Sequence, residues 1–532
     1  MYANLKSLQF MKKVKTDFFR KYHKWLGLII TINLLMFAGS GILLNHRSLI
    51  AHLHFPRKYM PEAYHINNWN NGVVKRNLTI GKDSILIYGN SGIWLTDSAF
   101  TNFTEFNAGL PTGTDYRKVE TAIVYNGSHL LIGTQHGLYE YRHKKWTPIY
   151  LGNEEQRVIS LTESNGKLFA ITRSELFVLH PFAKDSTWVI EQDHIPAYAQ
   201  NTEVGLFRTL WVIHSGEIYG KWGKLLVDFL GLCMATLAIT GIIYFIIPVY
   251  IKKKRDKVKE KLSKIKIFNQ KNLKIHNTIG VWLLPLLLLN TLTGMFLRPP
   301  FLIPIANSVV SPIPYTKLAA HNYWEDKLRL IQYDEDLKSF LLFTSEGVYT
   351  YMPFSENPPV ALPSQPTISV MGINLCEKIA PYTYLIGSFS GLYIWNIKDA
   401  YQLDAMNMQP VGYENRTSRP IGEQVISGLI KASDSTYYYS DYNTGIQALH
   451  HHQTFTAMPE EMKDIKMPLW NISLEIHTGR IFQGIMGDFY ILIVPLTGLA
   501  TLFVLISGVI TWYKIKYKRK KVIPNTISSS ES

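Results

Sequence analysis

Cysteine and charge are both scarce in this sequence, and each shortage excludes a class of protein. Two cysteines, Cys233 and Cys376, occur in 532 residues, and no CxxC motif is present. Neither a disulfide scaffold nor a thiolate zinc site can therefore be built. Charged residues make up 18% of the chain, below the roughly 25% of a typical soluble domain. Because 47% of the residues are hydrophobic, the chain has enough apolar material to bury and is not disordered.

The sequence also lacks the short motifs of soluble enzymes. It contains no GxSxG, HExxH, P-loop or GxGxxG pattern, which removes the usual hydrolase, zinc-protease, nucleotide and dinucleotide sites. No nicotinamide or flavin domain is predicted, so any redox role needs electrons from another molecule.

The net charge of +15 is concentrated in three short segments. Residues 1–24, 251–275 and 514–532 together carry 24 basic and 4 acidic side chains, whereas the rest of the chain is slightly acidic. Each basic segment borders an apolar run, which is the pattern of membrane helices with cytoplasmic flanks. We interpret the positive charge as a topology signal and expect no nucleic-acid partner.

Four apolar runs are long enough to cross a bilayer, which takes about 20 helical residues. The first run is too long for the apolar part of a cleaved signal peptide and has no small-residue cleavage site after it. The chain is therefore predicted to be a multi-pass protein of the bacterial inner membrane, with both termini cytoplasmic. The predicted spans are residues 25–44, 225–250, 276–297 and 489–513; residues 1–24, 251–275 and 514–532 are cytoplasmic, and residues 45–224 and 298–488 are periplasmic inserts.

Both inserts are predicted to be all-β. Six stretches repeat an apolar run, a short polar turn and a second strand that starts at glycine or serine, with three copies in each insert. The hairpin glycines recur every 44–54 residues within an insert, near the roughly 40–50 residue period of propeller blades. We predict one propeller of about six blades, split between the inserts, and the alternative is two β-sandwich-like domains. The stretches are 85–97, 130–141, 168–180, 340–351, 384–395 and 437–450, with hairpin glycines expected at Gly92, Gly137, Gly347, Gly391 and Gly445.

The membrane part is an internal duplication. In spans one and three, a histidine is followed by glycine four and eighteen residues later, from His23 and from His276. Eighteen residues make five helical turns, so Gly41 and Gly294 are expected directly above these histidines, as a groove for a flat macrocycle. Two parallel repeats are related by an axis along the membrane normal. The same glycines could instead serve close helix packing.

The duplication predicts histidine pairs at two depths, as two bis-histidine b-type haems would require. His23 and His276 lie at the cytoplasmic ends of their spans and form the inner pair. His214 and His477 precede spans two and four and are symmetry mates on the outer side. His46 is a third candidate for the outer site, where symmetry favours His214 and depth favours His46. The haem iron would be the metal held by these histidines, although each could also be a polar cap at the membrane surface.

Other polar residues near the spans have open interpretations. Asp228 in span two is an ionisable group near the outer surface, where function is the default hypothesis. Asn33 and Asn290 are expected to hydrogen-bond between helices. Arg47 and Arg298 could pair with haem propionates or serve as snorkelling anchors.

Three stretches around the spans share histidine, glycine and aromatic residues. They read FRKYHKWLGLII…GSGILLNHR (19–47), KIHNTIGVW…LTGMF (274–296) and LEIHTGRIFQGIMGDF…LISGVITWYK (474–514). Together they resemble the PepSY-associated transmembrane family of bacterial inner-membrane proteins. Some members of that family look like di-haem ferric-siderophore reductases. No clear PepSY domain is visible in this chain, and the propeller-like inserts stand in its place, which leaves the substrate open.

These observations predict a transmembrane electron-transfer protein with two haem b groups. A cytoplasmic donor or quinol would supply electrons, and a periplasmic acceptor such as a ferric siderophore in iron uptake would receive them, which would make the chain a ferric reductase. The alternative is a haem-free protein in which the spans anchor a propeller that binds a periplasmic partner or peptide. A transporter subunit is a third interpretation, disfavoured by four spans with few buried charges.

Overall fold

A computed structural model divides the chain into two compact units, each of which is discontinuous in sequence. It describes residues 2–152, 157–181, 188–197, 203–254, 259–319, 322–369, 371–412, 422–432 and 436–521. Residues 1–47, 202–320 and 471–532 form unit 1, and residues 48–201 and 321–470 form unit 2. Parts of the predicted basic segments, 255–258 and 522–532, lie outside the described residues.

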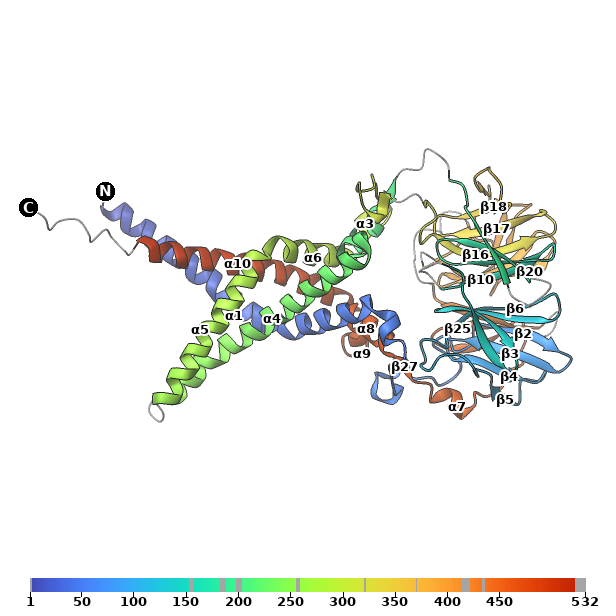
Figure 1. The fold of residues 1–532 in the computed structure, drawn as a ribbon, viewed down its shortest axis with the longest axis horizontal. Coiled ribbons are helices and arrows are strands. Elements are labelled where there is room, and N and C mark those ends of the chain that lie inside the picture. The colour runs from blue at the N-terminus through green and yellow to red at the C-terminus, as the bar shows by residue number, and fades with distance from the viewer. Residues whose placement is uncertain are drawn as a thin grey trace, which may run out of the picture. The chain divides into compact units, whose positions relative to one another are not determined.

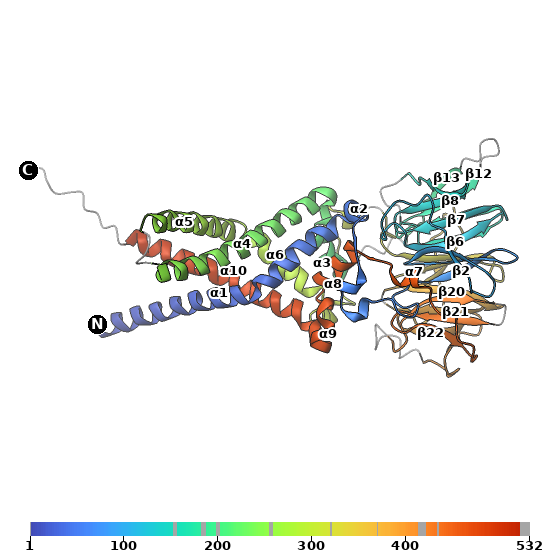
Figure 2. The same ribbon diagram turned by 90° about the horizontal axis from the view of Figure 1, so that it is seen from below.

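Unit 1 is a bundle of helices (Figures 1 and 2). The long helix α1 packs against α4 and α10, α4 also packs against α5, and α6 packs against α10 and α3. The apolar helices meet in a small cluster that includes Leu230, Leu237, Leu287 and Leu505. The principal helices are α1 (Tyr2–Asn45), α3 (Leu206–Ser215), α4 (Gly220–Lys254), α5 (Lys259–Trp282), α6 (Leu284–Phe296), α8 (Leu469–His477), α9 (Gln483–Met486) and α10 (Ile493–Lys521), with the short α2 (Arg47–Ile50) after α1 and η3 (Glu217–Tyr219) between α3 and α4; η7 (Arg480–Phe482) and η8 (Gly487–Leu492) flank α9.

Three helical segments are long and apolar enough to cross a membrane, and a bent pair is a fourth candidate. The three are Phe18–Asn45, Glu217–Lys253 and Arg480–Lys516. The fourth combines Ser263–Trp282 with Leu284–Phe296, which meet at an angle of 68°. Among the described residues, three spans are therefore found, or four if the bent pair is one span.

The bend corrects the prediction of a straight third span over residues 276–297. Helix α5 ends at Trp282, and α6 starts at Leu284 with Pro285 in its first turn. Proline has no N–H to donate to the preceding turn, and its ring clashes with the carbonyl four residues earlier. His276 and Gly294 consequently lie on two different helices, so Gly294 is not stacked five straight turns above His276.

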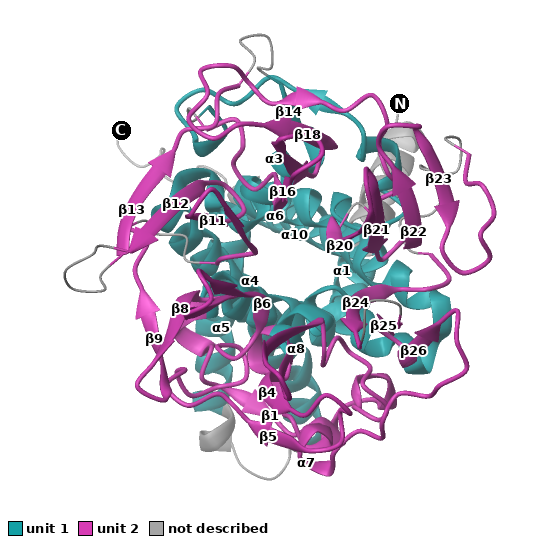
Figure 3. Cartoon of the chain, turned by 90° about the vertical axis from the view of Figure 1, so that its right-hand side faces the viewer, with its two compact units in different colours: residues 1–47, 202–320, 471–532 teal, residues 48–201, 321–470 magenta. Residues whose placement is uncertain are grey.

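Unit 2 consists of antiparallel sheets that follow one another around a ring (Figure 3). Among the described residues, five sheets have four strands each; the sixth has three strands and joins the first through a parallel pairing of β2 with β24, so that these two form one seven-stranded sheet. The sheets, named I to VI in chain order, are β2–β5 (Arg76–Gly81, Ser84–Gly89, Gly92–Thr96, Phe103–Glu105), β6–β9 (Val119–Tyr125, His129–Thr134, Gly137–Arg142, Lys145–Ile149), β10–β13 (Ser160–Ser164, Lys167–Ile171, Leu176–Pro181, Trp188–Asp193), β16–β19 (Leu328–Asp334, Ser339–Thr344, Val348–Tyr351, Val360–Ala361), β20–β23 (Ile373–Ala380, Thr383–Ser388, Gly391–Asn396, Tyr401–Asp404) and β24–β26 (Ile426–Lys431, Tyr437–Asp441, Gly445–Leu449).

Each of the six predicted repeat stretches forms a hairpin, which is central in sheets I to V and lies at the edge of sheet VI. In sheet V, for example, Ser388 pairs with Gly391 across the turn between β21 and β22. Gly92, Gly347, Gly391 and Gly445 have positive φ angles, which glycine adopts without steric cost. Gly137 does not, so at this position the turn itself does not require glycine.

Hydrophobic clusters fill the seams between successive sheets, including the seam that closes the ring. Trp69, Ile87 and Trp94 of the first insert pack with Ile430 and Tyr438 of the second, between sheets I and VI. The seam between sheets III and IV also joins the two inserts, through residues such as Phe169 and Phe340, whose ring centres are 4.6 Å apart. Unit 2 therefore requires both inserts.

The inserts are narrower than predicted, because their ends belong to the helical unit. Residues 206–215 and 469–477, assigned from sequence to the β inserts, form α3 and α8. Two short sheets join the ends of the inserts: β1 (His54–Phe55) pairs with β27 (Met467–Pro468), and β14 (Val204–Gly205) pairs with β15 (Val309–Val310).

Ion pairs tie the innermost strands of the ring to one another. Glu120 of β6 accepts hydrogen bonds from Lys75, next to β2, and from Arg157, next to β10. Burial alone would raise the pKa of the Glu120 carboxyl, but the charges of Lys75 and Arg157 outweigh burial and hold this pKa well below its ordinary value. Arg76 similarly pairs with Glu377 of β20. Positive and negative side chains therefore alternate from strand to strand, and each of the two carboxylates lies beside at least one cation.

Candidate cofactor site in the helical unit

The inner histidine pair predicted from sequence is assembled in the structure. His23 of α1 and His276 of α5 face one another with ring centres 6.2 Å apart and ring planes at 87°. One histidine comes from each repeat. Their placement on α1 and α5 follows from the packing of both helices against α4.

The outer pair is formed by His214 and His477, the combination that symmetry favoured. The ring centres lie 6.0 Å apart, and the planes are inclined by 42°. His214 lies near the end of α3 and His477 at the end of α8. These two short helices bring the histidines against the spans from outside the long helices.

In all four histidines, Nδ1 lies within hydrogen-bond distance of an oxygen atom that belongs to the other repeat. His23 Nδ1 lies 2.9 Å from the Val504 carbonyl oxygen, and His214 Nδ1 lies 3.0 Å from that of Asn290. His477 Nδ1 lies 3.1 Å from the Phe37 carbonyl oxygen, and His276 Nδ1 lies 2.9 Å from the Thr240 hydroxyl oxygen. A carbonyl accepts the Nδ1 proton and thereby fixes the tautomer, which leaves Nε2 unprotonated and able to ligate a metal.

A glycine preceded by a hydroxyl residue stands beside each histidine. A Cβ atom added to Gly508 would lie 2.8 Å from His23 Cε1, and one added to Gly294 would lie 2.5 Å from His214 Cε1. The matching hydroxyls lie 2.9–3.5 Å from the histidine Nδ1 atoms. The four sets are His23 with Ser507–Gly508, His276 with Thr240–Gly241, His214 with Thr293–Gly294 and His477 with Ser40–Gly41.

These contacts correct the prediction that Gly41 and Gly294 form a groove above His23 and His276. Both glycines instead border the outer histidines, and the glycines of spans two and four border the inner ones. These glycines therefore allow an imidazole from another helix to approach closely, instead of forming a groove for a macrocycle. The sequence carries a further signal for these contacts, since serine or threonine precedes glycine at all four positions.

The separation within each pair fits one metal ion between two imidazoles. A metal–nitrogen bond of about 2 Å on each side, with each nitrogen about 1.1 Å from its ring centre, places the ring centres roughly 6.3 Å apart. The observed separations are 6.2 and 6.0 Å. Within the described ranges, no three histidine, cysteine or acidic side chains are grouped to hold a metal. Each pair thus offers two ligands, the number that a haem iron takes from a bis-histidine site.

His46 is not brought to the outer pair. Its Nε2 atom lies 2.7 Å from Oδ2 of Asp228, which also accepts a hydrogen bond from Asn45. An imidazole whose Nε2 donates to a carboxylate has no free nitrogen on that side for a metal. The structure therefore separates His46 from the four other candidate histidines and gives Asp228 its partner.

The two asparagines make the interhelical bonds expected of them. Asn33 donates to the Thr497 hydroxyl, and Asn290 donates to the backbone carbonyl of His214. Near Asn290, the Nε atom of Arg298 is buried without a hydrogen-bond partner among the described residues, although its guanidinium contacts Tyr490. A buried guanidinium with one open N–H suits an additional anionic oxygen.

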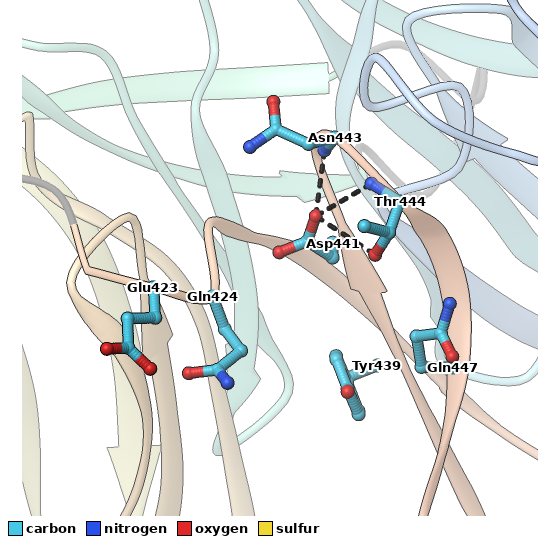
Figure 4. A pocket seen from close by; sticks show the side chains of 7 residues that line it. All are labelled: Glu423, Gln424, Tyr439, Asp441, Asn443, Thr444 and Gln447. Carbon is cyan, nitrogen blue, oxygen red and sulfur yellow. Dashed lines mark hydrogen bonds between the residues drawn. The ribbon is translucent and has the colours of Figure 1, made fainter.

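Unit 2 contains a separate polar pocket of about 340 Å³ (Figure 4). The Asp441 carboxylate is already used by the turn, because its Oδ1 accepts from Asn443 N and Thr444 N at 2.8 Å. The remaining lining side chains present amide, carboxylate and phenol groups, which suit a small polar ligand. No motif in the sequence indicated this pocket, which is lined by Glu423, Gln424, Tyr439, Asp441, Asn443, Thr444 and Gln447.

Substitution of Gly294 tests the close packing of the outer pair. In Gly294→Ala, the new methyl group would lie 2.5 Å from His214 Cε1, so the imidazole must move away from His477. We expect the outer pair to lose the spacing that one bound metal would need; in a protein that holds one haem at each pair, the haem content would fall to about half. Gly39→Ala on α1 is the matched control, because a Cβ atom there meets nothing within 4 Å; equal haem content in the two variants would contradict the packing argument.

Comparisons with known proteins agree with the duplicated helical unit. The description of the PepSY-associated TM region matches residues 3–247 and again residues 247–515, once for each repeat. No curated protein matches the sequence.

Several solved structures overlap with much of the chain at low similarity. One is a Bacteroides thetaiotaomicron protein of unknown function, with 9% identity, coverage of 71% of this chain and 69% of that one, and a TM-score of 0.33. Another is YCF48 bound to D1 peptide, with 10% identity, coverage of 72% of this chain and 94% of that one, and a TM-score of 0.28. PorZ of Porphyromonas gingivalis, described as a surface component of the type-IX secretion system, has 12% identity, coverage of 73% of this chain and 48% of that one, and a TM-score of 0.30. The chain spans 40% of the length of an extracellular domain of a B. thetaiotaomicron two-component system protein (10%, 73% of this chain, 0.32). Since the family description covers nearly the whole sequence, the chain is a membrane protein that belongs to the PepSY-associated TM family.

Proposed function

We propose that this protein transfers electrons across the bacterial inner membrane through two b-type haems. The observation that carries the proposal is the pair of cross-repeat histidine sites, with ring centres 6.2 and 6.0 Å apart and every Nδ1 atom engaged. His23 and His276 would hold the inner haem, and His214 and His477 the outer one. A bound haem supplies reversible one-electron chemistry at its iron.

The residues of the chain fix where electrons can enter and leave. Helix α1 contacts both sites, through His23 and through Gly41 beside His477, and these positions are about 27 Å apart along the helix. That length is most of a hydrocarbon core of roughly 30 Å. The four Nδ1 hydrogen bonds orient the imidazoles, and the buried Arg298 Nε offers a partner for a propionate.

The topology of the proposal follows the charge distribution. Four spans, with the bent pair α5 and α6 as one of them, place both termini and the basic loop in the cytoplasm. Unit 2 then lies in the periplasm as a six-bladed split propeller. A cytoplasmic donor or quinol would reduce the inner site, and a periplasmic ferric chelate, with a ferric siderophore as the leading candidate, would accept electrons from the outer site.

The absorption spectrum of the purified protein tests this function directly. We expect a Soret band and, after dithionite, sharp α and β bands, with two haems per chain by pyridine haemochrome. A colourless preparation from haem-replete cells would overturn the proposal and favour a haem-free anchor for a ligand-binding ring.

Cysteine labelling tests the topology separately. Both native cysteines are buried, so background labelling should be low. Ser263→Cys lies at the first residue of the bent span, on its proposed cytoplasmic side, and should be shielded from an impermeant thiol reagent in intact spheroplasts, whereas Ser390→Cys in unit 2 should react. Labelling of Ser263→Cys without permeabilisation would contradict the proposed orientation.

A further inference from the structure

The polar group around Asp228 breaks the internal symmetry of unit 1. Asp228 is 8% exposed and accepts hydrogen bonds from His46 Nε2 at 2.7 Å and from Asn45 Nδ2 at 3.0 Å. Each of the four histidines and its Ser/Thr–Gly partner has a counterpart in the other repeat. This group occurs once.

The sequence of the second repeat shows what replaces it. By the 253-residue offset that relates His23 to His276, Asn45 and His46 correspond to Arg298 and Pro299. Asp228 corresponds to a position within residues 491–495, which are all apolar. A carboxylate in a membrane span is costly and usually functional. Its restriction to one repeat means that the duplicated haem scaffold does not require it.

The group is attached to the outer histidine pair through the backbone. Asn45 Nδ2 donates to Asp228 and also to the carbonyl oxygen of Ser215, the residue after His214. His46 directly follows α1 and lies five residues beyond Gly41, which borders His477. The His46 side chain is 32% exposed, so water can reach its ring. An acid–base pair thus lies between the outer site and the outer solution.

We propose that His46 and Asp228 take up a proton when the outer site is reduced. This inference rests on the proposed haem function. One electron from the donor adds one negative charge to a region of low dielectric, where an uncompensated charge is expensive. One proton from the outer solution binds at Nδ1 of His46, since Nε2 donates to Asp228. The resulting imidazolium is stabilised by the Asp228 carboxylate, and the net charge around the outer site is unchanged.

Among the charged and titratable groups around the outer site, His46 is the one that we propose as the proton acceptor. Several are already paired with one another, and histidine is the side chain that ordinarily titrates between pH 5 and 8. The charged side chains on the surrounding elements are Arg47 after His46, Lys224 one turn before Asp228, the Arg208–Glu217 pair of α3 and η3, and the Arg480–Glu475 pair with Arg298 beside it.

Redox titration of the purified full-length protein at several pH values tests this proposal. The outer signal is the one that His477→Ala removes. In the wild type, its midpoint should fall with rising pH, towards about 59 mV per unit for one proton per electron. Asp228→Asn and His46→Gln should flatten that slope and leave the inner midpoint unchanged. Glu217→Gln, which removes a carboxylate on the same side, is the matched control and should retain the slope.

A second measurement does not depend on fitting two midpoints. Reduction in weakly buffered solution should consume one proton per outer haem in the wild type, detected with a pH indicator, and none in His46→Gln. Wild-type proton uptake or an unchanged slope in both variants would overturn the inference while leaving the haem function intact. A protein without haem would overturn both.

Discussion

Replacing His276 with alanine should remove the proposed inner haem and leave the proposed outer one in place. The substitution would delete one of its two axial ligands, and a b-type haem is held by ligation and burial alone. The outer site shares no ligand with it and lies about 27 Å away along α1. Haem content by pyridine haemochrome should fall to about half of wild type, and the remaining spectrum should be that of a single low-spin species.

The other histidines give the internal controls for this result. His23→Ala should reproduce the effect of His276→Ala, because the two rings face one another across 6.2 Å. His214→Ala and His477→Ala should remove the outer signal instead. His46→Ala should retain both haems, since His46 bonds to Asp228. Full wild-type haem content in both His23→Ala and His276→Ala would show that these histidines are not ligands.

The two inserts should fail to fold when they are expressed apart. Residues 48–201 alone would expose their side of the seam between sheets III and IV, where Phe169, Ile171, Leu176 and Val178 are buried. At about 1.5 kcal/mol for each side chain, this loss of about 6 kcal/mol is comparable with the roughly 5–15 kcal/mol that stabilises a whole domain. The fragment would also lose the closing seam of sheets I and VI. We expect aggregation, measured by size-exclusion chromatography.

Joining the inserts provides the matched control. Residues 48–201 and 321–470, connected by a flexible linker, restore both seams and should give one soluble unit with a single cooperative unfolding transition. The segment that follows the first insert pairs with the segment that precedes the second, through Val204 and Val310. A monomeric, cooperatively folded 48–201 fragment would contradict the requirement for both inserts.

Local sequence patterns were sufficient for the elements themselves. Alternating apolar residues located all six hairpins, with a turn glycine in five of them and a serine in the sixth, because a strand pair and its turn are specified within about twelve residues. The identical histidine spacing in spans one and three identified the inner pair, because two copies of one structure place equivalent residues about the same axis. The outer partner of His477 could not be chosen in this way, since His46 and His214 both satisfied the local criteria.

Contacts between distant segments decided the rest. A straight-helix extrapolation placed Gly294 above His276, but Pro285 breaks the backbone hydrogen bonding between them, and Gly294 packs against His214 instead. The choice of His214 over His46 depended on Asp228, 182 residues away, which binds the His46 ring. Periodicity reports which face of one element is apolar, whereas the partner of a polar side chain is set by how helices from both repeats pack. The sequence by itself determined the duplicated histidines and the hairpins; only the tertiary structure decided which rings face one another.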